Sequence, residues 1–235
     1  MNKPIIFLGS SMAMTMFVEA ADHMGIPIHG IIDKDYYGNT DTLHELPVID
    51  SEECFDNAEK LNYYRDNFQF FVAVNPLPMQ DATTTRNREK RYRLIDLVKQ
   101  HNLECATLIS KMTSISPKST IGKNVFIGNL VTAEPYVSVG DFTNIWGLLV
   151  IGHHAQIGEN CCIQRHTDVY GSAKIGNDVH LSGFSGIVEE CSIGDGAWIQ
   201  PGIRVHRDVK PGEIVGFTRE SLRRTTPFLG SGQSG

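Results

Sequence analysis

The sequence predicts a small α/β domain followed by a three-sided coil of short parallel strands, and three observations lead to this fold class. Glycine is scarce in residues 1–114, which hold only four of the 22 glycines, and it is frequent in the rest of the chain. Beyond residue 114 an aliphatic side chain recurs every six positions. Before it, short apolar runs alternate with segments of helical spacing. A joint change in composition and periodicity marks a change of architecture.

The six-residue repeat covers sixteen positions from Ile115 to Val205, and fifteen of them are Ile, Val or Leu. The next position is often glycine, and the residue two places before each aliphatic is mostly small, as at Ala155 and Cys161. A period of six fits neither a helix nor a long strand, but it fits a short strand followed by a corner. Three units would close one coil, so residues 18 apart should stack, with the aliphatic side chains inside. Glycine is expected to relieve the backbone at the corners.

The front of the chain alternates between strand-like and helix-like segments. Strands are expected at Pro4–Ser11, Ile28–Asp33, Leu46–Ile49 and Phe68–Val74, and helices at Met12–Met24 and Arg86–Gln100. This order favours a parallel sheet with helices on its faces, that is, a Rossmann-like domain. We place this domain at residues 1–108, the coil at 109–216 and a low-complexity tail at 217–235.

Ligands of parallel sheets bind at the carboxyl ends of the strands. The candidates for substrate binding are the residues at those ends, which are Gly9, Ser10, Ser11, Asp33, Lys34 and Asn75. The first turn lacks a complete GxGxxG pattern, so a purely structural strand–helix turn is the alternative.

Composition narrows the classes of partner and compartment. A formal net charge of -6 leaves no broad basic field for nucleic acid. No apolar run approaches the roughly 18 residues of a membrane span, and the first strand is too short for a signal peptide. The five cysteines are odd in number and lack CxxC spacing. We interpret them as reduced thiols of a cytoplasmic protein, not as disulfides or metal ligands.

Several motifs together resemble one known family. They are the strand–GSS–helix–IID front, the FVAVNP strand followed by Arg86, and the stretch IGHHAQIGENCCI…GSAKIGNDVHLSGFS…IGDGAWIQPG. Over about residues 3–215 the chain is similar to the NeuD/PglD-type sugar acyltransferases. The resemblance implies a left-handed β-helix, a homotrimer and acetyl-CoA in the groove between neighbouring coils. It also implies a nucleotide-linked sugar in the front domain and no metal.

Acyl transfer from a thioester needs a base for the acceptor's proton, and histidine suits this role because it titrates near neutral pH. His153 is the third residue of the hexapeptide IGHHAQ, a corner that should face out of the coil. The family's catalytic histidine has this place, so the resemblance implies that His153 is the general base. The next residue, His154, stands where the family commonly has an acid that orients the base, and it is the second catalytic candidate. A solvated corner histidine is the alternative for His153.

The acyl donor has its own candidates. Stacking by 18 puts Asn144, Cys162, His180 and Trp198 in one column. The resemblance implies a donor contact at Cys162, where some relatives have a histidine. The cofactor-binding candidates are Asn144, Cys162, His180 and two glycines that would leave room for the pantetheine arm, Gly171 and Gly183. Structural corners are an equal alternative for these two glycines. Cys162 as a covalent nucleophile is an alternative.

Two further surfaces are predicted near these candidates. The apolar segment Trp146–Leu149 is expected to be buried between subunits if the coil forms a trimer, and an interior side-chain cluster is the alternative. Basic residues crowd the end of the coil and are candidates to meet the phosphates of CoA: Arg204, Arg207, Lys210, Arg219, Arg223 and Arg224. The family's closing GxPA turn reads Gly216-Phe-Thr-Arg here.

The leading hypothesis is acetyl transfer from acetyl-CoA to the amino group of a nucleotide-linked 4-amino sugar. O-acetylation of sialic acid or a related sugar is the first alternative. A non-catalytic trimeric scaffold that binds sugar nucleotides is the second. A metal hydratase is the third, and it would need three histidines that converge on one metal ion.

Overall fold

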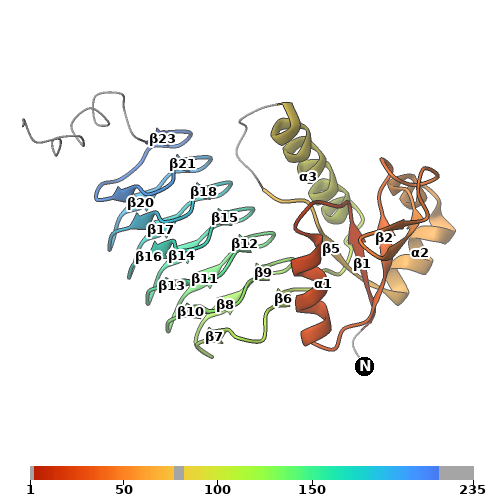
Figure 1. Cartoon of the computed structure of the whole chain (residues 1–235), viewed down its shortest axis with the longest axis horizontal. Coiled ribbons are helices and arrows are strands. Elements are labelled where there is room, and N and C mark those ends of the chain that lie inside the picture. The colour runs from red at the N-terminus through yellow and green to blue at the C-terminus, as the bar shows by residue number, and fades with distance from the viewer. Residues whose placement is uncertain (1–2, 77–81, 217–235) are drawn as a thin grey trace, which may run out of the picture.

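The computed structural model describes residues 3–76 and 82–216, which form an α/β domain and a three-sided parallel β-helix (Figure 1). The coil extends away from the α/β domain, and helix α3 lies beside the point where they meet (Figure 1). The pattern of its stacked parallel sheets is consistent with a left-handed β-helix. The first strand of the coil, β6 (Leu108–Ile109), begins at the predicted domain boundary.

The α/β domain is built on one five-stranded sheet. Its strands are β1 (Ile5–Leu8), β2 (Ile28–Ile32), β3 (Thr42–Leu43), β4 (Leu46–Asp50) and β5 (Gln69–Val72). They lie in the order β3-β4-β2-β1-β5, and only β3 is antiparallel to its neighbour. The helices are α1 (Met14–His23), η1 (Glu52–Asp56), α2 (Ala58–Asn67) and α3 (Ala82–Gln100).

The sheet is covered on both faces because its strands are apolar on both sides. Phe7 and Ile31 pack with Met14 and Phe17 of α1 on one face. On the other face, the strand residues that alternate with these contact η1, α2 and α3. The predicted strands and the two predicted helices are confirmed, although α3 begins four residues before the expected Arg86. Strand β3 and helices η1 and α2 were not predicted from the sequence.

The coil consists of three parallel sheets, one on each side. The sheet nearest the α/β domain, called the junction sheet here, contains β6, β9 (Phe126–Ile127), β12 (Asn144–Ile145), β15 (Cys162–Ile163), β18 (His180–Leu181), β21 (Trp198–Ile199) and β23 (Ile214–Val215). The second contains β7 (Ser114–Ile115), β10 (Val131–Ala133), β13 (Leu149–Ile151), β16 (Asp168–Val169), β19 (Gly186–Ile187) and β22 (Arg204–Val205). The third contains β8 (Thr120–Ile121), β11 (Ser138–Val139), β14 (Gln156–Ile157), β17 (Lys174–Ile175) and β20 (Ser192–Ile193).

The predicted 18-residue register of the coil is confirmed. Cys162 pairs with Asn144 on one side and with His180 on the other, and His180 pairs with Trp198. The repeating aliphatic residues from Ile127 to Val205 are buried and form a single core along the axis. No coil buries this core alone, so the stacking of successive coils stabilises the fold.

The expected role of glycine at the corners holds at the last corners, where Gly196 and Gly202 have a φ of 68° and 73°, but not along most of the coil. The left-handed residue of each corner lies three places after the aliphatic, and from Asn124 to Glu190 it is never glycine. The glycine that directly follows the aliphatic permits a close approach of coils instead. A Cβ on Gly152 would lie 2.6 Å from the backbone nitrogen of Gly171, one coil further along. The glycines that directly follow the aliphatic are therefore required for space between backbones, not for a positive φ.

The two parts of the chain meet across the junction sheet. Trp146 packs on Phe126 and on Phe17 of α1, and Phe126 also contacts Phe17. The prediction that Trp146–Leu149 forms a subunit-facing patch is therefore largely wrong. Leu149 is in the coil core and Trp146 contacts the α/β domain of the same chain, while Leu148 is 44% exposed.

Candidate active site

His153 lies on the turn between β13 and β14, and its side chain faces out of the coil as predicted. It borders a hollow, called the corner hollow here, which is lined by Glu134, Val150, Gly152, His153, Asp168, Val169, Tyr170, Gly171 and Glu189. The backbone N–H of His153 donates to Oε2 of Glu134 at 2.9 Å. Its Nδ1 lies 3.1 Å from Nδ1 of His154.

The imidazole of His153 lies directly against Gly171. A Cβ on Gly171 would be 2.9 Å from Cε1 and 3.0 Å from Nε2 of His153, closer than side chains normally approach. The space at this glycine is thus filled by the imidazole. The contact of Gly171 with the pantetheine arm stays a prediction, and the structure adds a role for this glycine in seating His153.

A methyl group at Gly171 should displace the imidazole while the coil stays folded, because φ of Gly171 lies outside the left-handed region. On the hypothesis that His153 is the general base of an acyl transfer, we expect Gly171→Ala to lower kcat by about 10–10²-fold, because the base would be slightly misplaced. Gly186→Ala is the matched control, since its Cβ would have only ordinary contacts at 3.8 Å and beyond. Steady-state kinetics with thermal unfolding of both variants tests this. Equal activity of the two variants would refute the seating role.

The predicted ligands in the α/β domain form a second cluster at the carboxyl ends of β1 and β2. Asp33 is fully buried, and Lys90 of α3 donates to both of its carboxylate oxygens at 2.7 and 2.8 Å. Ser10 Oγ donates to Asp33 at 3.1 Å, and Lys90 also bonds Asp35 at 2.6 Å. Although burial opposes its charge, the hydrogen bonds to Asp33 and Asp35 raise the pKa of Lys90. We call Ser10, Asp33, Asp35 and Lys90 the strand-end cluster.

The remaining residues at these strand ends serve the local structure as well. Ser11 Oγ donates to the carbonyl of Ala73 at 2.7 Å, and the backbone N–H of Lys34 donates to Glu52. Gly9 has a φ of +69°, and a Cβ there would be 2.7 Å from Leu94. Lys90 was not among the predicted ligands, although the basic character of its helix was visible in the sequence.

A third candidate site is a hollow that Asn75 of the α/β domain and Gly183 of the coil both line. They line the junction hollow, together with Met12, Ala13, Met16, Trp146, Gln164, Arg165, His166 and Phe184. The ring of His166 stacks on Phe184 at 4.6 Å between centroids and 11° between planes. The hollow is therefore apolar and aromatic on much of its wall, with amide and guanidinium groups beside it.

The column of predicted donor-binding residues is covered by the α/β domain. Asn144 is fully buried, Cys162 is 1% exposed and His180 is 6% exposed. Asn144 Nδ2 donates to Oδ1 of Asn75 at 3.4 Å. These side chains cannot contact a CoA molecule on the coil surface, because the domain occupies that face, so this part of the prediction is corrected.

Cys162 is also unsuited to be a nucleophile. Burial raises the pKa of its thiol to about 12, so the thiolate that would attack a thioester does not form at neutral pH. Burial likewise raises the pKa of Cys161 to about 12, in line with the predicted packing role of that residue inside the coil.

His180 makes the stability of the chain depend on pH. Burial lowers its pKa to about 4, from 6.5 in an unfolded chain. Below pH 6.5 the unfolded state binds a proton that the folded state does not, so stability falls as pH decreases toward 4. We expect this residue to contribute a loss of about 2–3 kcal/mol between pH 7 and 4.5. Urea unfolding of His180→Gln should show a correspondingly smaller loss, whereas the exposed control His206→Gln should match the parent; an equal loss in all three would contradict the assignment.

The basic residues at the end of the coil are partly engaged. Arg204 lies over the ring of Tyr170 at 4.8 Å and donates to its hydroxyl at 2.6 Å. Arg207 forms an ion pair with Glu213 at 2.6 Å, and Lys210 is exposed. Arg219, Arg223, Arg224 and the sequence after Gly216 lie outside the described residues, as does the predicted tail.

Comparisons with known proteins bear on this architecture. No protein-family model matches the chain. UDP-3-O-acylglucosamine N-acyltransferase of Methylorubrum extorquens is 37% identical over 105 residues, which are 45% of this chain and 29% of that protein. Bifunctional protein GlmU of Carboxydothermus hydrogenoformans is 28% identical over 210 residues, 84% of this chain and 42% of that protein. The chain thus spans less than half the length of these curated relatives.

Solved structures match nearly the whole chain. PerB of Caulobacter crescentus, in complex with CoA and GDP-perosamine, has a TM-score of 0.74 at 18% identity, and the match covers 90% of this chain and 92% of that one. The acetyltransferase domain of PglB from Neisseria gonorrhoeae has a TM-score of 0.75 at 16% identity, with 91% and 96% covered. The chain has the fold of the hexapeptide-repeat sugar acyltransferases. The resemblance drawn from the sequence motifs is confirmed at this level.

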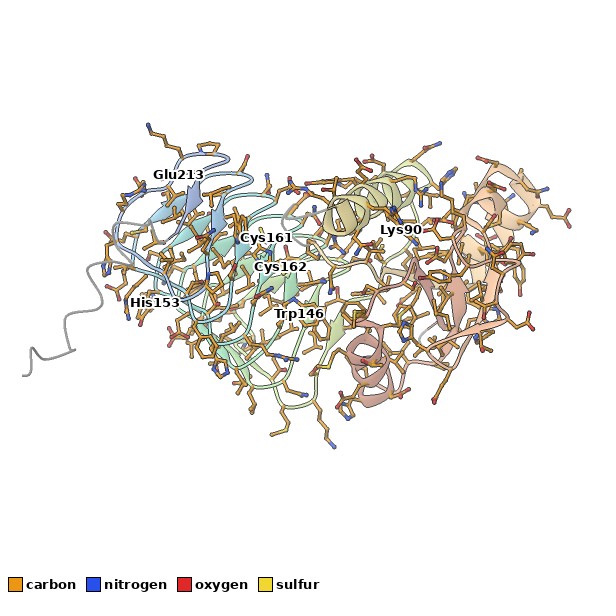
Figure 2. All side chains as sticks on the ribbon, turned by 45° about the horizontal axis from the view of Figure 1, so that its top comes forward. Lys90, Trp146, His153, Cys161, Cys162 and Glu213 are labelled. Carbon is orange, nitrogen blue, oxygen red and sulfur yellow. The ribbon has the colours of Figure 1, made fainter. Side chains whose placement is uncertain are left out.

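The acyltransferase fold holds its candidate residues far apart within one chain. Figure 2 shows His153 toward the coil end of the molecule and Lys90 of the strand-end cluster on α3 at the α/β domain, with Trp146 between them in this view. Within residues 3–76 and 82–216, no group of three or more His, Cys, Asp or Glu side chains is placed to hold a metal ion. No helix in the described part of the chain is both long and apolar enough to cross a membrane.

Proposed function

We propose that this chain is a sugar acyltransferase that moves an acetyl group from acetyl-CoA to the amino group of a nucleotide-linked 4-amino sugar. The observation that carries the proposal is the outward imidazole of His153, which leans on Gly171 and is bonded through Nδ1. This arrangement leaves Nε2 to act as a base. The fold shared with PerB, which was solved with CoA and GDP-perosamine, supports the same substrate classes here.

The chemistry requires one bond to form and one to break. The amine nitrogen attacks the carbonyl carbon of the thioester, a C–N bond forms, and the C–S bond to CoA breaks. His153 takes the proton from the attacking amine at Nε2 and returns it to the departing thiolate. A positioned base of this kind contributes roughly 10²–10⁴-fold in rate.

The α/β domain is the proposed site for the nucleotide sugar. Arg86, Lys90 and Arg93 line a shallow hollow with Asp35 and Glu89, beside the carboxyl ends of the strands. Guanidinium groups suit the diphosphate of such a substrate because they present paired donors. Asn75 connects this Rossmann-like domain to the junction hollow, where the sugar ring would lie. Gly183, which was predicted to contact the acyl donor, also lines that hollow.

We infer that a single chain does not complete this reaction, because His153 lies on the coil, well apart from Lys90 of the strand-end cluster in Figure 2. We propose that a neighbouring copy in a homotrimer brings its His153 to the junction hollow. Light scattering should then give a mass of about three times the 26.1 kDa of one chain. A monomer with full activity would contradict this part of the proposal.

The decisive experiment measures the release of free CoA thiol from acetyl-CoA over a panel of acceptors. The panel contains UDP- and GDP-linked 4-amino sugars, the matching 4-hydroxy sugars and free sialic acid. We expect turnover only with the amino sugars. Turnover of the hydroxy sugars or sialic acid would establish the O-acetylation alternative. Binding of sugar nucleotides without any thiol release would favour a non-catalytic scaffold.

A further inference from the structure

The two most exposed large apolar side chains in residues 3–76 and 82–216 line the same hollow. Met12 is 97% exposed and Phe184 is 71% exposed. Both line the junction hollow, Met12 from the turn before α1 and Phe184 from a corner of the coil. Neither side chain belongs to a core of the described structure. Because exposed apolar side chains that gather at one cavity indicate a binding surface, these two residues point to a ligand.

The ring of Phe184 is held as a flat platform. It stacks on His166 at 4.6 Å between centroids and 11° between planes, so one face of the ring is covered and the other is open. The backbone does not require phenylalanine here, because φ is 61°, a left-handed value that is unfavourable for a bulky residue. The same corner position holds Asn124 and Asn160 in two other coils, with a φ of 54° and 55°.

Polar groups border this apolar surface. Asn75 Oδ1 accepts from Nδ2 of Asn144 at 3.4 Å, and Gln164 Oε1 accepts from the backbone N–H of Gly183 at 3.2 Å. These bonds orient both amides, and each amide has N–H groups that can donate to a hydroxyl. The guanidinium of Arg165 also lines the hollow.

The combination matches the chemistry of a sugar ring. A pyranose carries C–H bonds on its two faces and hydroxyl groups around its rim. The C–H bonds are slightly positive and meet the slightly negative face of an aromatic ring, while the hydroxyl groups meet the amides. The hollow has a volume of about 670 Å³, which is within the range of small-molecule sites and has room for such a ring.

We propose that Phe184 and Met12, called the sugar clamp here, hold the two faces of the sugar ring of the acceptor. The inference deepens the proposed function and rests on it for the identity of the ligand. Phe184 is the rigid side of the clamp, and Met12 is the adaptable side because a thioether chain adjusts to irregular shapes. One side comes from the coil and the other from the α/β domain. The clamp therefore determines affinity for the sugar, while the nucleotide is bound elsewhere.

The test separates the sugar from its nucleotide by titration calorimetry on the full chain without acetyl-CoA. The probes are the UDP- and GDP-linked 4-amino sugars of the panel, with UDP and GDP alone. The parent should bind one sugar nucleotide more tightly than the corresponding diphosphate. In Phe184→Asn the affinity for that sugar nucleotide should fall about three- to ten-fold, the effect of one lost aromatic stack. Met12→Ser should lower it about three-fold. Binding of the diphosphate should not change in either variant.

Two exposed apolar residues outside the hollow supply matched controls. Leu130 has the same corner position as Phe184, three coils away, with a φ of 60° and 49% exposure, so Leu130→Asn makes the same change of backbone and surface. Met112 is 62% exposed, so Met112→Ser matches the change at Met12. Both controls should bind the sugar nucleotide and the diphosphate like the parent.

The outcomes distinguish the clamp from the proposed function. In turnover, Phe184→Asn should raise KM for the acceptor by the same factor as the loss of affinity and leave KM for acetyl-CoA unchanged. Equal affinity of the parent and Phe184→Asn for the sugar nucleotide would overturn the clamp, even if the parent acetylates that acceptor. A parent that binds none of the sugar nucleotides would refute the proposed function and the clamp together. A smaller mass by light scattering in Phe184→Asn but not in Leu130→Asn would assign Phe184 to a subunit interface, and it would also overturn the clamp.

Discussion

His153→Ala should lower kcat by about 10²–10⁴-fold while KM for acetyl-CoA changes little. The reason is that the variant keeps the corner hollow but loses the Nε2 lone pair to which we assign, in the proposed function, the proton of the attacking amine. Because the side chain is exposed at a corner and contributes nothing to the coil core, the free energy of unfolding should stay within about 0.5 kcal/mol of the parent. Free CoA thiol release, measured beside thermal unfolding, tests both statements.

The matched control is His206→Ala, which removes another exposed histidine of the coil outside the described hollows. It should retain the parent rate. An unchanged rate in His153→Ala would remove this residue from the mechanism. A loss of activity that follows a loss of folded protein would assign it a structural role instead.

Arg91→Met should destabilise the protein more than any other single change considered in α3. Arg91 is 1% exposed and lies between the two parts of the chain. Its Nε donates to Oδ1 of Asn160 at 2.6 Å, and its terminal nitrogens donate to the carbonyls of Val74 and Phe142. Burial lowers its pKa to about 10, so it remains charged at neutral pH.

Methionine fills a similar volume but donates no hydrogen bond, so the carbonyl oxygens of Val74 and Phe142 would remain buried without this partner. Each such group costs roughly 1–3 kcal/mol, and we expect a total loss of about 2–5 kcal/mol in urea unfolding. Arg86→Met is the control, because Arg86 is exposed on the same helix and its loss should cost less than about 0.5 kcal/mol. If the two variants unfold at the same urea concentration, Arg91 does not join the domains as described.

The network around Arg91 also explains why Asn144, Cys162 and His180 of the junction sheet are covered. Asn160 Nδ2 donates to Asp178 at 2.6 Å, and Tyr92 of α3 donates to the same carboxylate oxygen at 2.6 Å. On the other side, Asn124 Oδ1 accepts from the backbone N–H of Val72 at 2.7 Å. These contacts hold the α/β domain over Asn144, Cys162 and His180.

Much of the architecture was predictable because a six-residue period encodes local geometry. The spacing of Ile151, Ile157 and Ile163 predicts which side chains point inward, and it therefore predicts that His153 points outward. The same spacing predicts the column of Asn144, Cys162 and His180, which the strand register confirms. The catalytic role of His153 stays a prediction, because position and orientation do not measure a reaction.

The predictions that needed correction concern residues whose surroundings depend on contacts between coils or between domains. Gly152 and Gly171 look like corner glycines in the sequence, but each is required by an atom one coil away or more. Asp33 looks like a free strand-end acid, but Lys90, 57 residues later, bonds both of its oxygens. Periodicity carries no information about such partners.

The sequence by itself determined the two-part architecture, the stacking register and the outward direction of residue 153, because each follows from side-chain spacing along a short strand. Tertiary structure alone decided which column of the coil is covered, which lysine neutralises Asp33 and which glycine seats the imidazole. These features depend on how the α/β domain docks on the junction sheet and how one coil lies on the next. Such contacts join residues that are far apart in the chain, and no local pattern specifies them.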